Sequence, residues 1–121
     1  MLNEDREQIL KLKKVTQRKI SNGEWYILEF LWEKPPQMIS EIVNYMRDEV
    51  GWAKSTTITT INRMEKKGLV RFRKFGNAKF LYPNIGREEI EKSELDDLVI
   101  RVYHGDVEKL ICQLRKFYNT H

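Results

Sequence analysis

Basic side chains are concentrated in one part of this sequence, between Lys54 and Lys79. This stretch holds eight Lys or Arg residues and one acid, Glu65, so it carries a charge of +7 in a chain whose net charge is +4. The remaining residues carry 14 basic and 17 acidic groups, or −3. Focused positive charge of this kind is typical of a surface that binds phosphate groups. A solvated basic face without a partner is the alternative interpretation.

The same stretch holds side chains that can read base edges. Thr and Ser hydroxyls contact phosphates or bases, Asn62 has the amide geometry for adenine, and Arg63 has the guanidinium geometry for guanine. Ile58 can meet the methyl group of thymine. The predicted DNA-binding residues are Lys54, Ser55, Thr56, Ile58, Thr59, Asn62, Arg63, Lys66, Arg71, Arg73, Lys74 and Lys79.

Three short helices are expected to position these side chains. The first starts at Ser21, which forms a capping box with Glu24, and ends before residues 35–36, which are both proline. The second covers roughly residues 39–48, with apolar positions spaced for one helix face. The third covers about residues 54–67 and ends at Gly68. Its run of Ser and Thr has poor helix propensity, so tertiary packing must hold it.

A β-hairpin is expected after the third helix. Residues 69–75 and 78–82 alternate in polarity around a two-residue Gly-Asn turn. Three helices followed by a hairpin is the order of a winged helix-turn-helix domain, in which the third helix lies in the major groove and the hairpin reaches phosphates or the minor groove. We therefore predict a mainly α fold with a small β-hairpin, the DNA-binding domain being residues 20–84. RNA is a weaker alternative, because no aromatic stacking platform is evident.

Two more amphipathic helices are expected toward the C-terminus, one over residues 87–103 and one capped by Asp106. Their apolar stripes exceed what a winged domain needs to cover, which predicts a homodimer on a pseudo-palindromic site. The alternative is that they fold back on their own subunit. Residues 85–121 are thus assigned to dimerisation, and residues 1–19 to an N-terminal helix or arm. The predicted dimerisation residues are Leu95, Leu98, Val99, Val102, Val107, Leu110, Ile111, Leu114 and Phe117.

Catalytic chemistry is not predicted. The chain has two histidines, His104 and His121, and no Ser/His/Asp set, metal-ligand spacing or glycine-rich phosphate loop, so we predict no enzyme, metal or cofactor. The acids at 88–91 suit the first turn of a helix rather than a catalytic pair. Cys112, beside Ile111, is expected to be buried. One cysteine, no apolar run long enough to cross a membrane and no secretory signal together favour the cytoplasm.

Several short motifs, taken in order, resemble the penicillinase-repressor family (BlaI/MecI/CopY type) over residues 20–115. The resemblance implies a dimeric bacterial repressor of inverted repeats upstream of β-lactamase, penicillin-binding-protein or copper-transport genes. It places Thr56, Thr59 and Arg63 at recognition-helix positions. The motifs are Ile20-Ser21-x-x-Glu24-Trp25, Trp52-x-x-x-Thr56-x-x-Thr59, Ile61-x-Arg63-Met64-x-x-Lys67-Gly68, Leu81-Tyr82-Pro83-Asn84-Ile85 and Tyr103-x-Gly105-Asp106.

The chain departs from the family pattern near its C-terminus. The copper branch carries paired Cys-x-Cys motifs, whereas only Cys112 is present here, so copper sensing is not expected. In the antibiotic-responsive branch a membrane sensor protease triggers cleavage at an Asn-Phe bond, and Gln113-Leu114 stands at the matching place. The chain ends at His121, before a helix that many members carry, so the dimer is expected to be weaker or to use residues 1–19. A winged module for protein contacts and a ligand-sensing winged regulator of another family are the alternatives.

Overall fold

The computed structural model describes residues 19–119, so the predicted N-terminal helix or arm lies outside the described residues, apart from Lys19. The described residues fall into two compact units, one comprising residues 20–87 and the other containing residues 88–119. None of the helices in the described part of the chain is long and apolar enough to cross a membrane.

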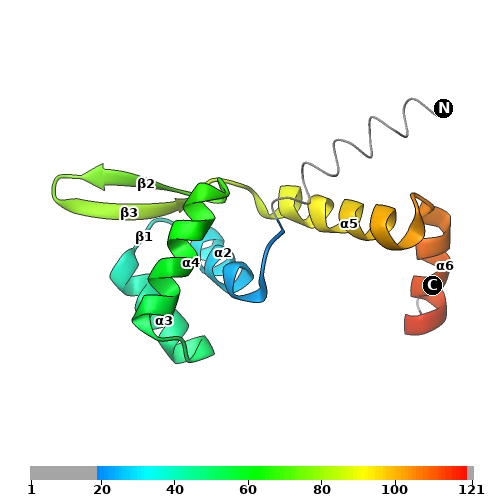
Figure 1. Ribbon diagram of the computed structural model, residues 1–121, viewed down its shortest axis with the longest axis horizontal. Helices are drawn as coiled ribbons and strands as arrows, with labels where there is room; N and C mark the ends of the chain where they lie inside the picture. The colour runs from blue at the N-terminus through cyan, green and yellow to red at the C-terminus, as the bar shows by residue number, and fades with distance from the viewer. Residues whose placement is uncertain (1–18, 120–121) are drawn as a thin grey trace. The chain divides into compact units, whose positions relative to one another are not determined.

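Three helices form most of the first unit: α2 (Asn22–Glu33), α3 (Ile39–Val50) and α4 (Lys54–Lys66) (Figure 1). Ser21 caps α2 through the predicted capping box with Glu24. The three-residue turn between α3 and α4 begins at Gly51, whose φ of 78° closes α3 in the left-handed conformation. The three predicted helices are therefore confirmed.

The hairpin consists of β2 (Val70–Phe75) and β3 (Ala78–Pro83), paired antiparallel around Gly76 and Asn77. A third strand, β1 (Gln37–Met38), pairs with β3, so the sheet order is β1-β3-β2. The mainly α winged fold is confirmed, but the sequence prediction missed β1. Two residues are too few to show the period-2 alternation by which a strand is recognised.

The core of the first unit lies between the three helices and the inner face of the hairpin. Its fully buried side chains come from α2, α3, α4 and β3, with Leu69 and Val70 joining at the start of the hairpin. Phe30 on α2 stacks on Tyr45 of α3 with ring centroids 4.2 Å apart, and Trp32 donates a hydrogen bond of 2.8 Å from its indole Nε1 to the Ile85 carbonyl. The first contact fixes α2 against α3, and the second fixes α2 against the segment that follows β3. Because α4 packs against both α2 and α3, these contacts also fix its position.

The second unit contains α5 (Arg87–Tyr103) and α6 (Val107–Tyr118), as predicted. The Asp106 side chain accepts a hydrogen bond from the Lys109 amide and caps α6. His104 lies in the turn between the two helices with a φ of 53°. The expectation that Cys112 is buried is wrong, because its thiol is exposed on α6. The expectation rested on the neighbouring Ile111, but successive residues of an α-helix are about 100° apart, so Cys112 lies on the side of α6 away from its apolar stripe.

Candidate nucleic-acid interface

One face of α4 is exposed and polar, and the opposite face is packed into the core. Thr57, Thr60, Ile61 and Met64 are buried, and the Thr60 hydroxyl donates a hydrogen bond of 2.8 Å to the Thr56 carbonyl. The predicted base-reading side chains all lie on the outer face. Six of them are exposed and Ile58 is half-buried: Ser55, Thr56, Ile58, Thr59, Asn62, Arg63 and Lys66.

An open groove runs along α4 beside the first residues of α2. Ser21 and Gly23 line one side, Trp52 lies between the helices, and Thr56, Thr59 and Arg63 are among the residues from α4. Ala53 precedes α4 and has no side chain that caps its amides. The start of α4 therefore leaves backbone amides open to an acceptor, and helix N-termini are suited to anions.

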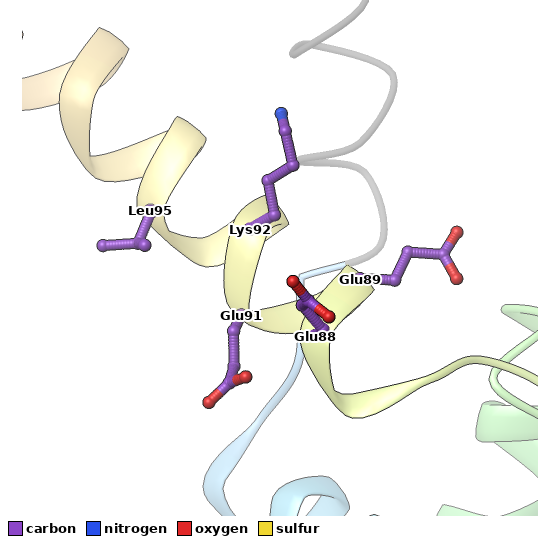
Figure 2. A pocket seen from close by; sticks show the side chains of 5 residues that line it. All are labelled: Glu88, Glu89, Glu91, Lys92 and Leu95. Carbon is purple, nitrogen blue, oxygen red and sulfur yellow. The ribbon is translucent and has the colours of Figure 1, made fainter.

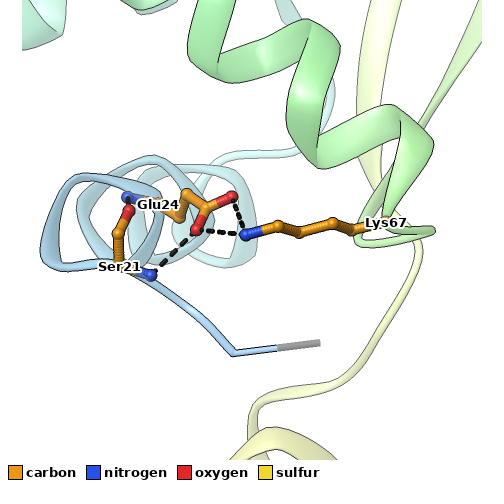
Figure 3. A network of polar contacts seen from close by, with 3 residues as sticks. All are labelled: Ser21, Glu24 and Lys67. Atoms are coloured by element: carbon orange, nitrogen blue, oxygen red, sulfur yellow. Dashed lines mark hydrogen bonds and ion pairs between the residues drawn. The ribbon is translucent and has the colours of Figure 1, made fainter. Parts of the chain in front are cut away.

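A buried ion pair joins the start of α2 to the end of α4 (Figure 3). The Glu24 carboxylate is fully buried and accepts hydrogen bonds of 2.9 and 3.0 Å from the Lys67 ammonium, as well as one of 2.8 Å from the Ser21 amide. Burial raises the pKa of Glu24, but the Ser21 amide bond and the bond to Lys67 outweigh it, so the pKa lies below its ordinary value of 4.5. The charged carboxylate therefore holds the C-terminal end of α4 against α2.

A second close contact fixes the other end of α4. The Trp52 ring packs directly on Gly23, and a Cβ atom at this glycine would overlap the indole. Because Trp52 lies two residues before α4 begins, this contact sets where the helix starts relative to α2. The helix that carries the predicted base-reading side chains is thus anchored at both ends, which compensates for its weak intrinsic propensity.

The hairpin, called the wing from here on (residues 70–83), presents two different faces. In the observed register, Lys74 pairs with Lys79 on the face that also bears the buried Val70 and Leu81. Residues 71 and 73, both arginine, lie on the opposite face because successive side chains alternate across a strand. The four predicted wing cations are all exposed, but they divide into two pairs on opposite faces.

Two of these wing cations are held by aromatic rings. The Lys79 ammonium lies 4.0 Å from the centre of the Phe72 ring, and the Arg71 guanidinium lies 5.2 Å from that of Tyr82. Cation–π contacts of this kind orient a charge without neutralising it. The wing therefore keeps its full positive charge.

The basic side chains of the predicted interface have no carboxylate partner within residues 19–119. The ion pairs there involve Arg47, Lys67, Arg87, Lys92 and Arg101, and only Lys67 belongs to the basic stretch. Unneutralised cations on α4 and the wing repel one another and gain by binding an anion. The surface has the electrostatics of a polyanion site.

The acids at the start of α5 form a different kind of surface. An open hollow is lined by Glu88, Glu89, Glu91, Lys92 and Leu95, and Figure 2 shows the three carboxylates pointing to different sides of the helix. Carboxylates that do not converge cannot act as a catalytic pair or share a cation. Within residues 19–119 no group of three His, Cys, Asp or Glu side chains is arranged to hold a metal ion.

The predicted dimerisation residues differ in exposure. Leu95, Val102, Val107, Leu114 and Phe117 are exposed, with Phe117 reaching 62%. By contrast Leu98, Val99 and Ile111 are half-buried, and Leu110 is 8% exposed. Leu110 therefore packs within the subunit, whereas five of the predicted dimerisation side chains remain exposed.

Sequence reasoning missed several residues of this surface. Gly23 and Trp52 form a close contact that no spacing rule predicts. The sequence identified Lys67 as a basic residue of this stretch but not as the partner of Glu24. The division of the wing cations between two faces could have been predicted from the sequence, because a two-residue turn fixes the register and hence the face of each side chain. The same register places Phe75 beside Arg73 on the outer face.

The three helices, the wing and the basic surface define a winged helix-turn-helix protein. The chain belongs to the penicillinase repressor family, whose model matches residues 20–117. This is a family of transcriptional repressors and not of enzymes, which confirms the predicted class.

Named relatives and solved structures agree with this assignment. The chain is 27% identical to the penicillinase repressor of Staphylococcus aureus over 83% of this chain and 79% of the relative. It is 28% identical to the methicillin resistance regulatory protein MecI of S. aureus strain N315 over 76% and 75%, respectively.

In structure, it resembles the Bacillus licheniformis BlaI monomer in complex with the blaP half-operator, with a TM-score of 0.54 and 24% identity over 59% of this chain and 87% of the other. That likeness supports the winged fold.

Proposed function

We propose that this chain is a cytoplasmic homodimer that represses transcription by binding an inverted-repeat DNA operator through α4 and the wing. The observation that carries the proposal is the set of exposed basic side chains on these two elements, which lack carboxylate partners in the described chain. A helix-turn-helix protein places the second helix of the motif in the major groove. Here that helix is α4.

Support also comes from the relatives. The B. licheniformis BlaI structure is a complex with a half-operator, and the MecI relative is a regulator of methicillin resistance by name. We infer by analogy that the target genes here belong to antibiotic resistance or a related stress response. A winged module for protein contacts alone would gain nothing from uncompensated cations on α4 and the wing.

The dimer is proposed to form through the exposed apolar side chains of α5 and α6. Two-fold homodimers match operators with two-fold symmetry, because each subunit reads one half-site. The apolar side chains involved are Leu95, Val102, Val107, Leu114 and Phe117.

Induction by a membrane sensor protease would require a change in the conformation of α6. The bond between Gln113 and Leu114 lies within α6, where the backbone is helical. A protease needs an extended backbone, so cleavage there requires α6 to unwind first. We therefore propose that a signal acts on the dimer equilibrium, by cleavage or by another route.

The proposal is tested by fluorescence anisotropy with a duplex from the DNA upstream of the protein's own gene and a scrambled duplex, each over a salt series. We expect binding to the upstream duplex to be roughly a thousandfold tighter, with a steep salt slope. Arg63→Ala is expected to lose roughly 1–3 kcal/mol of specific binding if Arg63 reads a base.

The control is Lys92→Ala, which removes a cation that pairs with Asp96 on α5 outside the proposed surface. It should bind like the wild type. Equal, weak binding of the wild type to both duplexes would argue against sequence-specific repression at this site, and no binding even at low salt would favour a protein-contact module.

A further inference from the structure

The tip of the wing carries an exposed aromatic ring. Phe75 is the last residue of β2 and is 56% exposed. Its ring meets Phe80 edge-on, with centroids 5.9 Å apart and an interplanar angle of 68°. The ring therefore contacts Phe80 on one side while more than half of the Phe75 surface stays exposed to water. Together with the half-buried Phe80, Phe75 forms a small aromatic patch at the tip of the wing that is accessible to a partner.

The shape of the tip limits what it can enter. Phe75 pairs with Ala78 across the turn formed by Gly76 and Asn77, so Phe75 is the only bulky side chain among these four residues. The B-DNA minor groove is about 6 Å wide, too narrow for a ribbon with side chains on both faces. A small tip with one planar ring fits that width.

The charge around the ring identifies the class of partner. No Asp or Glu occurs between Glu65 and Glu88, so every charged residue of the wing is basic. Arg73 lies on the same face as Phe75, and Lys74 and Lys79 lie on the opposite face. The partner must therefore combine dense negative charge with an apolar surface. The minor groove of DNA does so, because its walls are deoxyribose rings and its potential is strongly negative.

We propose that Phe75 packs against the sugar walls of the DNA minor groove, with Arg73 beside it, so that the wing makes an apolar and shape-dependent contact in addition to phosphate contacts. This inference rests on the proposed function, since it requires that the wing meets DNA. It assigns to the wing a preference for narrow, A·T-rich minor grooves next to the half-site.

The test compares wild type and Phe75→Ala by fluorescence anisotropy on two duplexes that share the upstream-region core. One duplex carries A·T flanks and the other carries G·C flanks. Losing the burial of about half a phenyl side chain should weaken binding to the A·T duplex about five- to twentyfold. The salt slope should not change, because Phe75 carries no charge.

Netropsin, which occupies A·T minor grooves, supplies an independent readout. It should weaken wild-type binding to the A·T duplex and weaken that of Phe75→Ala less, because Arg73 is then the only one of the two side chains left for the groove. The matched control is Tyr26→Ala, which removes an exposed aromatic ring from α2 instead of the wing and should bind as the wild type does. If Phe75→Ala disturbs the hairpin, Phe75→Leu keeps an apolar side chain at the tip and should retain most of the affinity.

The outcomes separate this inference from the proposed function. If the wild type binds the duplexes and Phe75→Ala binds them equally well, the minor-groove contact is refuted. Wild-type binding that netropsin does not affect would also refute it. A wild type that binds neither duplex would refute the proposed function, and the wing contact with it.

Discussion

Replacing the buried carboxylate of Glu24 by an amide should destabilise the fold. The carboxylate is fully buried and accepts hydrogen bonds from the Ser21 amide and the Lys67 ammonium, whose side chain is 24% exposed. In Glu24→Gln the amide oxygen can still accept a hydrogen bond, but the charge assistance is lost. Bonds to charged groups contribute about 1.5–3 kcal/mol and neutral ones about 1. We expect a loss of about 1–3 kcal/mol, below the roughly 3–5 kcal/mol of an unpaired buried charge.

The effect should depend on pH in a defined direction. Burial raises the pKa of Glu24, but the Ser21 and Lys67 hydrogen bonds lower it by more, so the native pKa lies below the ordinary value of 4.5. A group with a lowered native pKa stabilises the fold above its unfolded pKa, and this contribution disappears as the pH falls through the native pKa. The difference between wild type and Glu24→Gln should therefore be constant near neutral pH and shrink below about pH 4.5.

Urea unfolding followed by circular dichroism, at one protein concentration because a dimer makes stability concentration-dependent, measures both effects. Glu33→Gln is the control, since it removes a carboxylate from an exposed position at the end of the same helix. It should change stability by less than about 0.5 kcal/mol. A Glu24→Gln protein as stable as the wild type at pH 7, or a difference that persists unchanged to pH 3, would refute the reasoning.

Three further changes test other parts of the molecule. Gly23→Ala should lower the free energy of unfolding in urea by about 1–3 kcal/mol, because the new methyl group overlaps the indole ring of Trp52. The control Gly86→Ala should leave it unchanged, because a Cβ atom there meets open space. A Gly23→Ala protein as stable as the control would argue against the close contact. Lys74→Ala should weaken upstream and scrambled duplexes alike and flatten the salt slope by about one unit, whereas Lys92→Ala should leave the slope unchanged. Leu114→Asp should lower dimer affinity in sedimentation, and an unchanged dimer would exclude this face of α6 as the interface.

Local signals in the sequence predicted most of the fold. The capping box at Ser21 and the glycine after α4 marked helix ends, and the Gly-Asn turn fixed the hairpin and its register. Each of these signals depends on residues close together in the chain, where backbone sterics and hydrogen bonding decide the conformation. β1 was missed because a two-residue strand forms only by pairing with β3, more than forty residues later.

The candidate interface was predictable in composition but not in arrangement. Charge counting found the basic stretch, yet it could not show that Lys67 turns inward to Glu24 while the neighbouring Lys66 faces solvent. That distinction depends on the packing of α2 against α4, which joins residues 43 positions apart. The burial of Leu110 was likewise decided by tertiary packing, since a repeat of apolar residues does not say which part of a wide stripe faces the subunit's own core. The exposure of Cys112, by contrast, was predictable, because helical spacing puts this residue outside the apolar stripe of α6.

The composition of α4 explains why this helix depends on long-range contacts for its stability. A helix that reads bases must expose short hydroxyl and amide side chains, and these are the residues that compete with the helical backbone for hydrogen bonds. It also starts at Ala53 without a side-chain cap, which leaves its first amides open. Its stability must therefore come from outside its polar face. The buried face supplies packing, Trp52 on Gly23 fixes the beginning, and Lys67 on Glu24 fixes the end. Because none of these contacts uses the exposed residues of α4, substitutions on that proposed DNA-binding face should leave the helix in place.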